Sequence, residues 1–299
     1  MGVDAPPKVT ALEPVGTPDW VMPKRITLRQ RMAQLRLRFG DWTPEPGAVR
    51  WLFIATFPNG GSTALAELLQ TASRATRVEY RAEGQWLVPQ MYLKENRWNA
   101  RADIDLSLIR KAWLREIARQ DTSPCVVIEK SPPNMVRMRE IMATFEDMPQ
   151  TLVTFTRDPY AVCASWARRY NPERLENEWG EDTLGMEATS AEYFAELGRM
   201  YGRRAQFLID LEDVAAARLS YEELTAQPAL TLDRLAELEP MLADVDRDAK
   251  VKVKNYDPQP LENMNDRQIA ALNGAQLGAI TVGLKEYAEA IHALGYELR

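Results

Sequence analysis

Two changes of pattern occur within the stretch Trp51-Leu-Phe-Ile-Ala-Thr-Phe-Pro-Asn-Gly-Gly-Ser-Thr-Ala-Leu-Ala-Glu-Leu-Leu69. Its first residues, through Thr56, are apolar or β-branched, which is typical of a strand that is buried on both faces. Leu65, Leu68 and Leu69 then recur at helical spacing. The stretch is therefore predicted to form a strand, a tight turn and a helix, and the rest of the fold is built around it.

The turn between this strand and this helix contains two glycines, Gly60 and Gly61. Glycine lets the backbone turn tightly because it carries no Cβ, and we expect Ser62 or Thr63 to cap the helix that follows. The start of a helix directs unpaired N–H groups and the positive end of the helix dipole at one place, which suits a phosphate or a sulfate. The turn is predicted to bind an anion, with an ordinary strand-to-helix turn as the alternative.

A Walker-type loop for nucleoside triphosphates has a lysine directly after its last glycine, and this lysine reaches the outer phosphates. The chain lacks this lysine, because Gly61 is followed directly by Ser62, and no other stretch supplies the pattern. The run Pro58-Asn59-Gly60-Gly61-Ser62-Thr63 instead resembles the 5′-phosphosulfate loop of sulfotransferases, Pro-Lys/Arg-x-Gly-Thr/Ser-Thr. Asn59 stands where the family usually carries a basic residue. A cation that helps the leaving phosphate must therefore come from elsewhere or be missing.

A charged pair, Glu129-Lys130, follows the predicted buried strand Cys125–Ile128. Ligands of open parallel sheets bind outside the carboxyl ends of the strands, so the pair is well placed for a site. The alternative is a surface salt bridge before a proline turn. The segment Glu129-Lys130-Ser-Pro also resembles the Glu-Lys-Thr/Ser-Pro segment of glycan-modifying and many bacterial sulfotransferases. This resemblance implies that Lys130 reaches the reacting sulfuryl group.

Arg157 lies at the end of the predicted strand Thr151–Thr156 and is followed by Asp158 and Pro159. Aspartate at the cap and proline at the first helical position are typical of a helix start. Ser165 lies about two turns into this helix, so a guanidinium and a hydroxyl could hold one phosphate. The segment resembles the 3′-phosphate-binding segment of sulfotransferases, Arg-x-Pro followed by a serine at the same spacing.

Tyr221 ends the predicted strand Arg218–Tyr221 and begins the sequence Tyr221-Glu-Glu-Leu224. By its pattern alone it would be a buried strand tyrosine. The sequence resembles the Tyr-Glu-Asp-Leu element of sulfotransferases, which implies that Tyr221 lies beside the adenine. The four segments together imply a sulfotransferase that uses 3′-phosphoadenosine-5′-phosphosulfate (PAPS) and covers roughly residues 50–295. A kinase with a degenerate phosphate loop and a nucleotide-binding pseudoenzyme are the alternatives.

In-line transfer of a sulfuryl group to an acceptor hydroxyl or amine requires a base, and charge on the departing phosphate must be stabilised. The only histidine, His292, lies far from every motif and is interpreted as structural. A carboxylate is therefore expected to act as the base. We predict Glu83, because it follows the second predicted strand, 77–80, where carboxylate-using relatives place theirs. Glu79 and Glu129 are the alternatives, and Lys130 with the loop N–H groups would replace the cation missing at Asn59.

Strand and helix patterns alternate along the chain, which indicates an α/β fold. We predict one domain, residues 50–299, with a central, mostly parallel sheet flanked by helices, in the P-loop-like architecture that the resemblance implies. Residues 1–49 are predicted to form an N-terminal arm with a basic helix over 24–39. Other predictions are helices over 106–118, 135–145, 191–211 and 277–294, and a loop or lid over 171–185. Lys250, Lys252 and Lys254 form either a solvated face or a second contact to the nucleotide.

Composition limits the remaining classes. Apolar residues make up 45% and charged residues 27% of the 299 residues, which is typical of a soluble globular protein. The net charge of −6 gives no reason to expect nucleic-acid binding. Cys125 and Cys163 are expected to be buried thiols, and the chain shows no metal-ligand spacing. Without a signal peptide or a membrane span, a cytoplasmic protein is expected. The acceptor could be a small molecule, a glycan or a peptide, and the oligomeric state stays open.

Overall fold

The computed structural model describes residues 44–299 apart from 46, 80, 121–122 and 252–259, together with Leu28 and Met32. Most of the predicted N-terminal arm, and with it the basic helix, lies outside the described residues. So do Tyr80 of the predicted second strand and Lys252 and Lys254 of the basic cluster. The domain boundary at residue 50 therefore stays a prediction.

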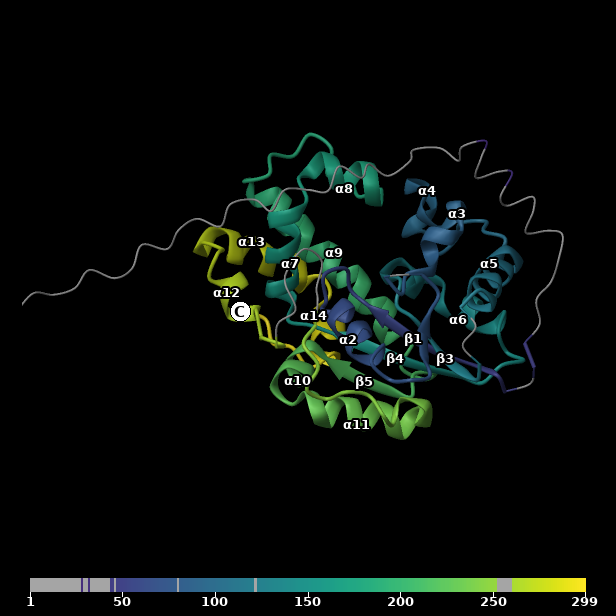
Figure 1. Cartoon of the computed structure of the whole chain (residues 1–299). Helices are drawn as coiled ribbons and strands as arrows, with labels where there is room; N and C mark the ends of the chain where they lie inside the picture. The colour runs from purple at the N-terminus through teal and green to yellow at the C-terminus, as the bar shows by residue number, and fades with distance from the viewer. Residues whose placement is uncertain are drawn as a thin grey trace, which may run out of the picture.

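The described part of the chain contains one sheet of five strands in the order β2-β3-β1-β4-β5 (Figure 1). All four neighbouring pairs are parallel, which confirms the predicted α/β fold with a parallel sheet. The central strand β1 pairs with β3, where Leu52 lies opposite Ile128, and with β4, where Ile54 lies opposite Val153. The bounds are Val49–Thr56 for β1, Ala75–Arg77 for β2, Cys125–Glu129 for β3, Gln150–Thr156 for β4 and Ala217–Ser220 for β5.

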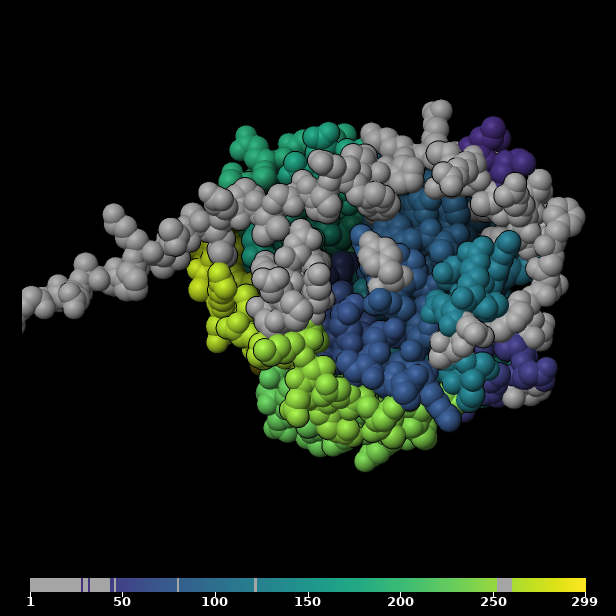
Figure 2. Space-filling view, viewed as in Figure 1, coloured from purple at the N-terminus to yellow at the C-terminus, as the bar shows by residue number. Residues whose placement is uncertain are grey.

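The side chains of β1 alternate between two hydrophobic cores, one on each face of the sheet. Leu52 and Ile54 face the helices α2 (Ser62–Leu69) and α11 (Pro228–Leu238), and Figure 2 shows this side of the molecule. Trp51 and Phe53 face the other core, and their rings stack with centroids 5.5 Å apart. This core is covered by helices that include α5 (Leu106–Ala118), α6 (Met138–Ala143), α7 (Pro159–Arg169), α9 (Ala191–Ile209) and α13 (Gly274–Lys285). Burial of β1 on both faces is as predicted.

Several local predictions are confirmed. Helix α5 has the predicted bounds. Helix α7 begins at Pro159, and the Asp158 carboxylate accepts a hydrogen bond of 2.9 Å from the Ala161 N–H, so the predicted cap is present. The remaining elements are η1 (Gly84–Leu87), α3 (Pro89–Tyr92), α4 (Lys94–Arg97), η2 (Pro132–Arg137), α8 (Pro172–Trp179), α10 (Tyr221–Ala226), η3 (Pro240–Leu242), α12 (Asn265–Ile269) and α14 (Ala288–Ala293).

Three predicted elements differ from the structure. Strand β2 shares only Arg77 with the predicted 77–80, and the predicted helix over 135–145 divides into η2 and α6. The segment 171–185 was expected to be a loop or lid, but it contains helix α8. Leu175 and Trp179 of this helix are buried in the core. Packing of these two side chains therefore stabilises α8, which its charged sequence did not predict.

The predicted closing helix is broken into α13 and α14. Tyr287, between them, has non-helical angles (φ −127°), and its ring packs against Gly202 of α9, where a Cβ would lie 2.2 Å from the ring. Gly295 ends α14 with a positive φ of 88°, as predicted. In the part of the chain that the structure describes, no helix is long and apolar enough to cross a membrane.

Candidate functional site

Each of the five strands is followed by part of the predicted site. The loop follows β1, Glu83 follows β2, Lys130 follows β3, Arg157 follows β4 and Tyr221 follows β5. Because all the strands are parallel, their carboxyl ends meet at one edge of the sheet. The sheet therefore gathers segments that are far apart in the sequence.

The loop after β1 is closed by a hydrogen bond of 3.0 Å from the Gly60 N–H to the Phe57 carbonyl. Asn59 and Gly61 both have positive φ, 59° and 95°. Helix α2 begins at Ser62 with Gly61 at the cap position, and no side chain caps its first turn. The prediction that Ser62 or Thr63 caps this helix is wrong, because both residues lie inside the helix. The uncapped first turn leaves helical N–H groups for a ligand.

Gly61 lies directly against the ring of Tyr221. A Cβ at position 61 would lie 2.4 Å from a ring carbon, so no larger residue fits there without a shift. Tyr221 is the first residue of α10, not the last residue of a strand, because Ser220 and Glu223 form a capping box around it. The Tyr221 hydroxyl donates a hydrogen bond of 2.7 Å to the Glu262 carbonyl. Loop, tyrosine and the segment before α12 thus form one packed unit.

Arg157 is buried, and its guanidinium lies 4.0 Å from the centroid of the Tyr221 ring. It donates three hydrogen bonds, all to uncharged oxygens: Nη1 to the Asn59 carbonyl (3.0 Å), Nε to Asn265 (2.8 Å) and Nη2 to Gln268 (2.9 Å). Burial lowers the pKa of Arg157. The arginine is thus fixed beside the loop. The sequence around Arg157 does not predict that Asn265 and Gln268 accept its hydrogen bonds.

Ser165 is buried on α7, on the helix that packs against the loop. The next residue, Trp166, donates an indole hydrogen bond of 2.9 Å to the Pro58 carbonyl. Ser165 and Arg157 share no hydrogen bond among the described residues. Arg157 contacts the loop through the Asn59 carbonyl, and Ser165 precedes the tryptophan that contacts Pro58. That the two residues hold one phosphate stays a prediction.

Lys130 is buried and connects two predicted parts of the site. Its ammonium donates to the Glu83 carboxylate at 2.6 Å and to the Thr63 hydroxyl, in the first turn of α2, at 3.2 Å. The alternative of a surface salt bridge between Glu129 and Lys130 is therefore wrong. The structure brings the predicted lysine, the predicted base and the loop into direct contact.

The Glu83 carboxylate is held from both sides. One oxygen accepts from Lys130, and the other accepts from the Gln85 amide (3.0 Å) and the Trp86 indole (2.9 Å). Burial by itself would raise the pKa of Glu83, but the Lys130 charge and these hydrogen bonds outweigh it, so the pKa lies below its ordinary value. Glu83 is thus ionised at neutral pH. Gln85 and Trp86 were not predicted from the sequence.

Glu129 has a different environment. It is fully buried and accepts hydrogen bonds from the N–H groups of Gly84 (3.0 Å) and Ser131 (3.1 Å), from the Ser131 hydroxyl and from the Asn134 amide (3.1 Å). No cation contacts it among the described residues, and burial raises its pKa to about 7. Glu129 therefore ties the end of β3 to the segment that carries Glu83.

Glu79, the other alternative base, accepts a hydrogen bond of 2.9 Å from the Arg81 N–H. Partial burial raises its pKa, and the charges of Glu83 and Lys130 also act on it. Glu79 thus lies near Glu83 and Lys130 but forms no ion pair with Lys130. His292 is exposed on α14, with its ring 3.8 Å from Glu297. Both cysteines are free and buried, as expected.

Comparison with known proteins identifies the family. A family model described as "Sulfotransferase family" matches residues 52–238, from β1 to the end of α11. The chain belongs to the sulfotransferase family. The matched part of this sulfotransferase includes the loop, Glu83, Lys130, Arg157 and Tyr221. It ends before the segment that holds Arg157 from α12.

Solved structures of sulfotransferases resemble this chain at low sequence identity. Sulfotransferase STF9 from Mycobacterium avium is 14% identical to this sulfotransferase, with 91% of this chain and 81% of that chain covered and a TM-score of 0.50. The sulfotransferase domain from the curacin biosynthetic pathway is 18% identical, with 86% and 100% covered and a TM-score of 0.44. A sulfotransferase from Alicyclobacillus acidocaldarius is 12% identical, with 84% and 96% covered and a TM-score of 0.47. No curated protein sequence matches this chain.

Proposed function

We propose that this sulfotransferase transfers a sulfuryl group from PAPS to a hydroxyl or amine of an acceptor. One observation carries the proposal: the Lys130 ammonium lies between Thr63 of the anion-binding loop and the Glu83 carboxylate. A cation for the leaving group and a base for the acceptor thus lie side by side at the start of α2. Family membership supports sulfuryl transfer over phosphoryl transfer.

The donor would be held on both sides of the loop. The uncapped N–H groups of α2 suit the phosphosulfate, and Arg157 with Ser165 suits the 3′-phosphate. The aromatic ring of Tyr221 lies beside Gly61 of the loop and beside Arg157, so it suits the adenine. Gly61 is in contact with the Tyr221 ring. The loop can therefore lie this close to Tyr221 only because position 61 has no side chain. The residues present therefore fit the nucleotide that the family resemblance implies.

In the proposed reaction the acceptor oxygen forms a bond to sulfur while the bond between sulfur and the 5′-phosphate oxygen breaks. Glu83 takes the acceptor proton, and Lys130 with the loop N–H groups stabilises the charge that develops on the phosphate. The products are a sulfate ester, or an N-sulfate for an amine, and adenosine 3′,5′-bisphosphate. Lys130 would also supply the cation that Asn59 lacks. We propose no metal ion, because side chains and N–H groups can meet the charge of the donor.

The proposal is tested by incubating the protein with sulfur-labelled PAPS and a panel of phenols, alcohols, amines, glycans and tyrosine peptides. Label in an acceptor, undiminished by EDTA, supports the proposal. Transfer only from ATP with Mg²⁺ would support the kinase alternative. Asn59 also motivates the pseudoenzyme alternative. Calorimetric binding of adenosine 3′,5′-bisphosphate without turnover of any acceptor would favour this one.

A further inference from the structure

The two oxygens of the Glu83 carboxylate accept different numbers of hydrogen bonds. Oε1 accepts from the Lys130 ammonium at 2.6 Å. Oε2 accepts from the Gln85 amide at 3.0 Å and from the Trp86 indole at 2.9 Å. An ionised carboxylate has about four lone-pair sites, two on each oxygen. Both sites of Oε2 are therefore occupied, and with the donors in the described part of the chain one site of Oε1 stays open.

The segment that carries the two donors of Oε2 is fixed by β3, by α5 and by Ser131. Gly84, at the start of η1, donates its N–H to Glu129 of β3 (3.0 Å), and the Trp113 indole of α5 donates to the Gly84 carbonyl (3.0 Å). The Gln85 N–H donates to the Ser131 hydroxyl at 3.2 Å, and Gln85 is fully buried. These contacts fix the backbone from which the Gln85 amide reaches Oε2.

The Trp86 ring is fixed by two side chains from the helices that follow η1. It packs against the Tyr92 ring of α3 with centroids 5.5 Å apart, and the Arg97 guanidinium of α4 lies 5.4 Å from its centroid. Tyr92 and Arg97 are both buried. They therefore limit the orientation of the indole ring, and with it the direction of the N–H that donates to Oε2.

Oε1 is the oxygen that is linked to the anion-binding loop. Its donor, Lys130, also donates to the Thr63 hydroxyl in the first turn of α2 at 3.2 Å. Although the Glu83 carboxylate accepts three hydrogen bonds, 16% of the Glu83 side chain is exposed, so an acceptor can reach it. In-line transfer requires a base near the acceptor atom, next to a sulfuryl group on the loop. Oε1 meets this requirement, whereas Oε2 is occupied by groups of η1.

We infer that Gln85 and Trp86 are positioning residues of the transfer reaction. By holding Oε2 of Glu83, they leave Oε1 as the atom that takes the acceptor proton. The O–H or N–H bond of the acceptor breaks and the proton bonds to Oε1, while the acceptor atom keeps the electron pair and bonds to sulfur. The bond between sulfur and the phosphate oxygen breaks, and its electron pair goes to that oxygen. This inference rests on the proposed function.

Trp86→Phe tests the inference, because it removes one donor from Oε2 but keeps an aromatic ring against Tyr92 and Arg97. We expect kcat for sulfuryl transfer from labelled PAPS to fall roughly ten-fold, as for one hydrogen bond to a charged group, with little change in KM for the acceptor. Gln85→Met removes the other donor with a side chain of similar length and should have the same effect. A thermal unfolding curve checks that each variant is folded.

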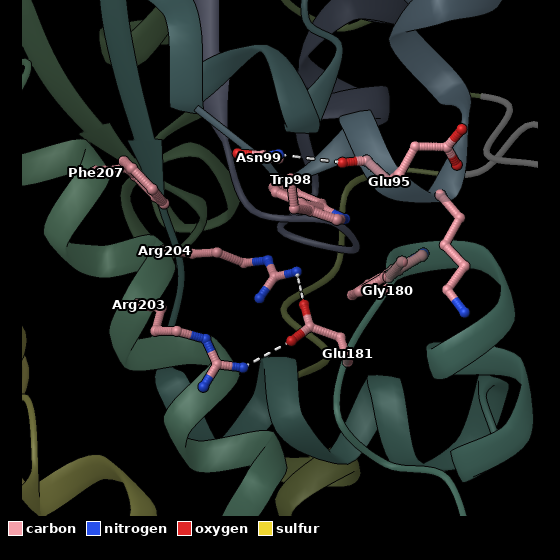
Figure 3. A pocket seen from close by; sticks show the side chains of 10 residues that line it. Glu95, Trp98, Asn99, Gly180, Glu181, Arg203, Arg204 and Phe207 are labelled. Atoms are coloured by element: carbon pink, nitrogen blue, oxygen red, sulfur yellow. Dashed lines mark hydrogen bonds and ion pairs between the residues drawn. The ribbon is translucent and has the colours of Figure 1, made fainter. Parts of the chain in front are cut away.

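Trp98→Phe is the matched control. It also removes an indole N–H, but the Trp98 nitrogen has no hydrogen-bond partner in the part of the chain that the structure describes. Figure 3 shows Trp98 above Arg204, with the guanidinium 3.9 Å from the ring centroid, in a pocket to which Glu83 does not contribute. Trp98→Phe should therefore leave kcat unchanged.

A double-mutant cycle separates positioning from a general loss of structure. If Trp86 acts through Glu83, the effect of Trp86→Phe on kcat should disappear in a Glu83→Ala background, because no carboxylate is left to position. A purely structural role would lower the residual turnover by the same factor in both backgrounds. If the acceptor instead bound Oε2, the Trp86 indole would compete with it, and Trp86→Phe would raise kcat.

The pH profile gives a second readout. The Lys130 charge and the hydrogen bonds from Gln85 and Trp86 lower the pKa of Glu83 against burial, and the charges of Glu79 and Arg97 also interact with it. Trp86→Phe should therefore move the acid limb of kcat/KM to higher pH, and Trp98→Phe should not. A more basic Glu83 would by itself favour transfer, so a fall in kcat above the acid limb reports lost positioning.

The outcomes distinguish this inference from the proposed function. If wild type transfers no sulfuryl group to any acceptor, the proposed function fails and the proton step fails with it. If wild type is active but kcat of Trp86→Phe and Gln85→Met is unchanged or higher, only the inference is overturned. An equal loss in the Glu83→Ala background also overturns only the inference. A fall that requires Glu83, together with the shifted acid limb, supports both.

Discussion

The loop after β1 lies between two buried cations that are held in different ways. On the β3 side, Lys130 contacts the loop through the Thr63 hydroxyl and is paired with the Glu83 carboxylate. On the β4 side, Arg157 contacts the loop through the Asn59 carbonyl and is otherwise held by Asn265, Gln268 and the Tyr221 ring. Arg157 forms no ion pair within the described ranges.

This difference suits the two cations to different functions. A cation held by uncharged oxygens keeps its charge available for an anionic ligand, which suits a nucleotide phosphate. A cation paired with a carboxylate holds that carboxylate ionised, which suits a base. The contrast between Glu83 and Glu129 shows the effect, because burial without a cation raises the pKa of Glu129 to about 7 while the pKa of Glu83 is lowered.

The largest effect is expected for Glu83→Gln, which keeps the shape but removes the base. We expect kcat to fall by a factor on the order of 10²–10⁴, and the fall should be smaller for a more acidic acceptor hydroxyl. Steady-state kinetics with two phenols of different acidity measure both. Glu79→Gln and Glu129→Gln are the matched controls. Near-normal turnover of Glu83→Gln with loss in either control would move the base to that residue, and activity in all three would end the carboxylate mechanism.

Lys130→Ala is expected to lower kcat by a factor on the order of 10²–10³ with little change in donor affinity, because charge on the leaving oxygen builds only in the transition state. The variant also makes Glu83 resemble Glu129. Burial of Glu83 is then opposed only by the hydrogen bonds from Gln85 and Trp86, so its pKa should rise and the acid limb of the pH profile of kcat/KM should move to higher pH. An acid limb that stays in place would mean that Lys130 does not set the ionisation of Glu83.

Arg157→Ala tests the other side of the loop. Loss of charge-assisted hydrogen bonds to a phosphate should weaken binding of adenosine 3′,5′-bisphosphate roughly ten- to a hundred-fold. Calorimetry measures the affinity, and a thermal unfolding curve without nucleotide checks that the variant is folded. Unchanged affinity in a folded variant would contradict the proposed role of Arg157 in binding the nucleotide phosphate.

The smallest effect on turnover is expected for Glu129→Gln, with kcat within about ten-fold of wild type, because the Gln amide can replace most of its hydrogen bonds. Its oxygen can accept from Gly84 and Ser131. Its NH₂ can donate to the Asn134 carbonyl oxygen, which has no partner in the described part of the chain. A large loss of kcat with an unchanged fold would assign Glu129 a part in the chemistry.

Glu129 also predicts a pH dependence of stability. Its pKa in the folded state, about 7, lies above the ordinary value of 4.5, so the folded protein binds the extra proton between these values. This stabilising contribution is complete below pH 4.5 and is lost as the pH rises through 7, by about 3 kcal/mol in all. Urea unfolding of wild type and Glu129→Gln between pH 4.5 and 8 measures it. A difference between the two that does not change with pH would contradict the raised pKa.

The sequence by itself predicted the elements whose signals are local. An apolar, β-branched run before a turn with two glycines predicted β1, and the Asp158-Pro159 start predicted α7 and its cap. Helical spacing predicted α5 with its observed bounds. The sequence also placed Lys130 and Arg157 at the ends of predicted strands, where ligands of open parallel sheets bind. These inferences depend on residues close in the chain and on one rule about parallel sheets.

The tertiary structure decided which charged side chain contacts which. Successive side chains along an extended chain point to opposite sides. The Glu129 side chain therefore points toward Gly84. The Lys130 side chain points to the loop and to Glu83, in the segment that follows β2. Packing likewise made α8 a helix and placed Arg204 among indole rings. Such contacts join residues far apart in the sequence, so no local pattern contains them.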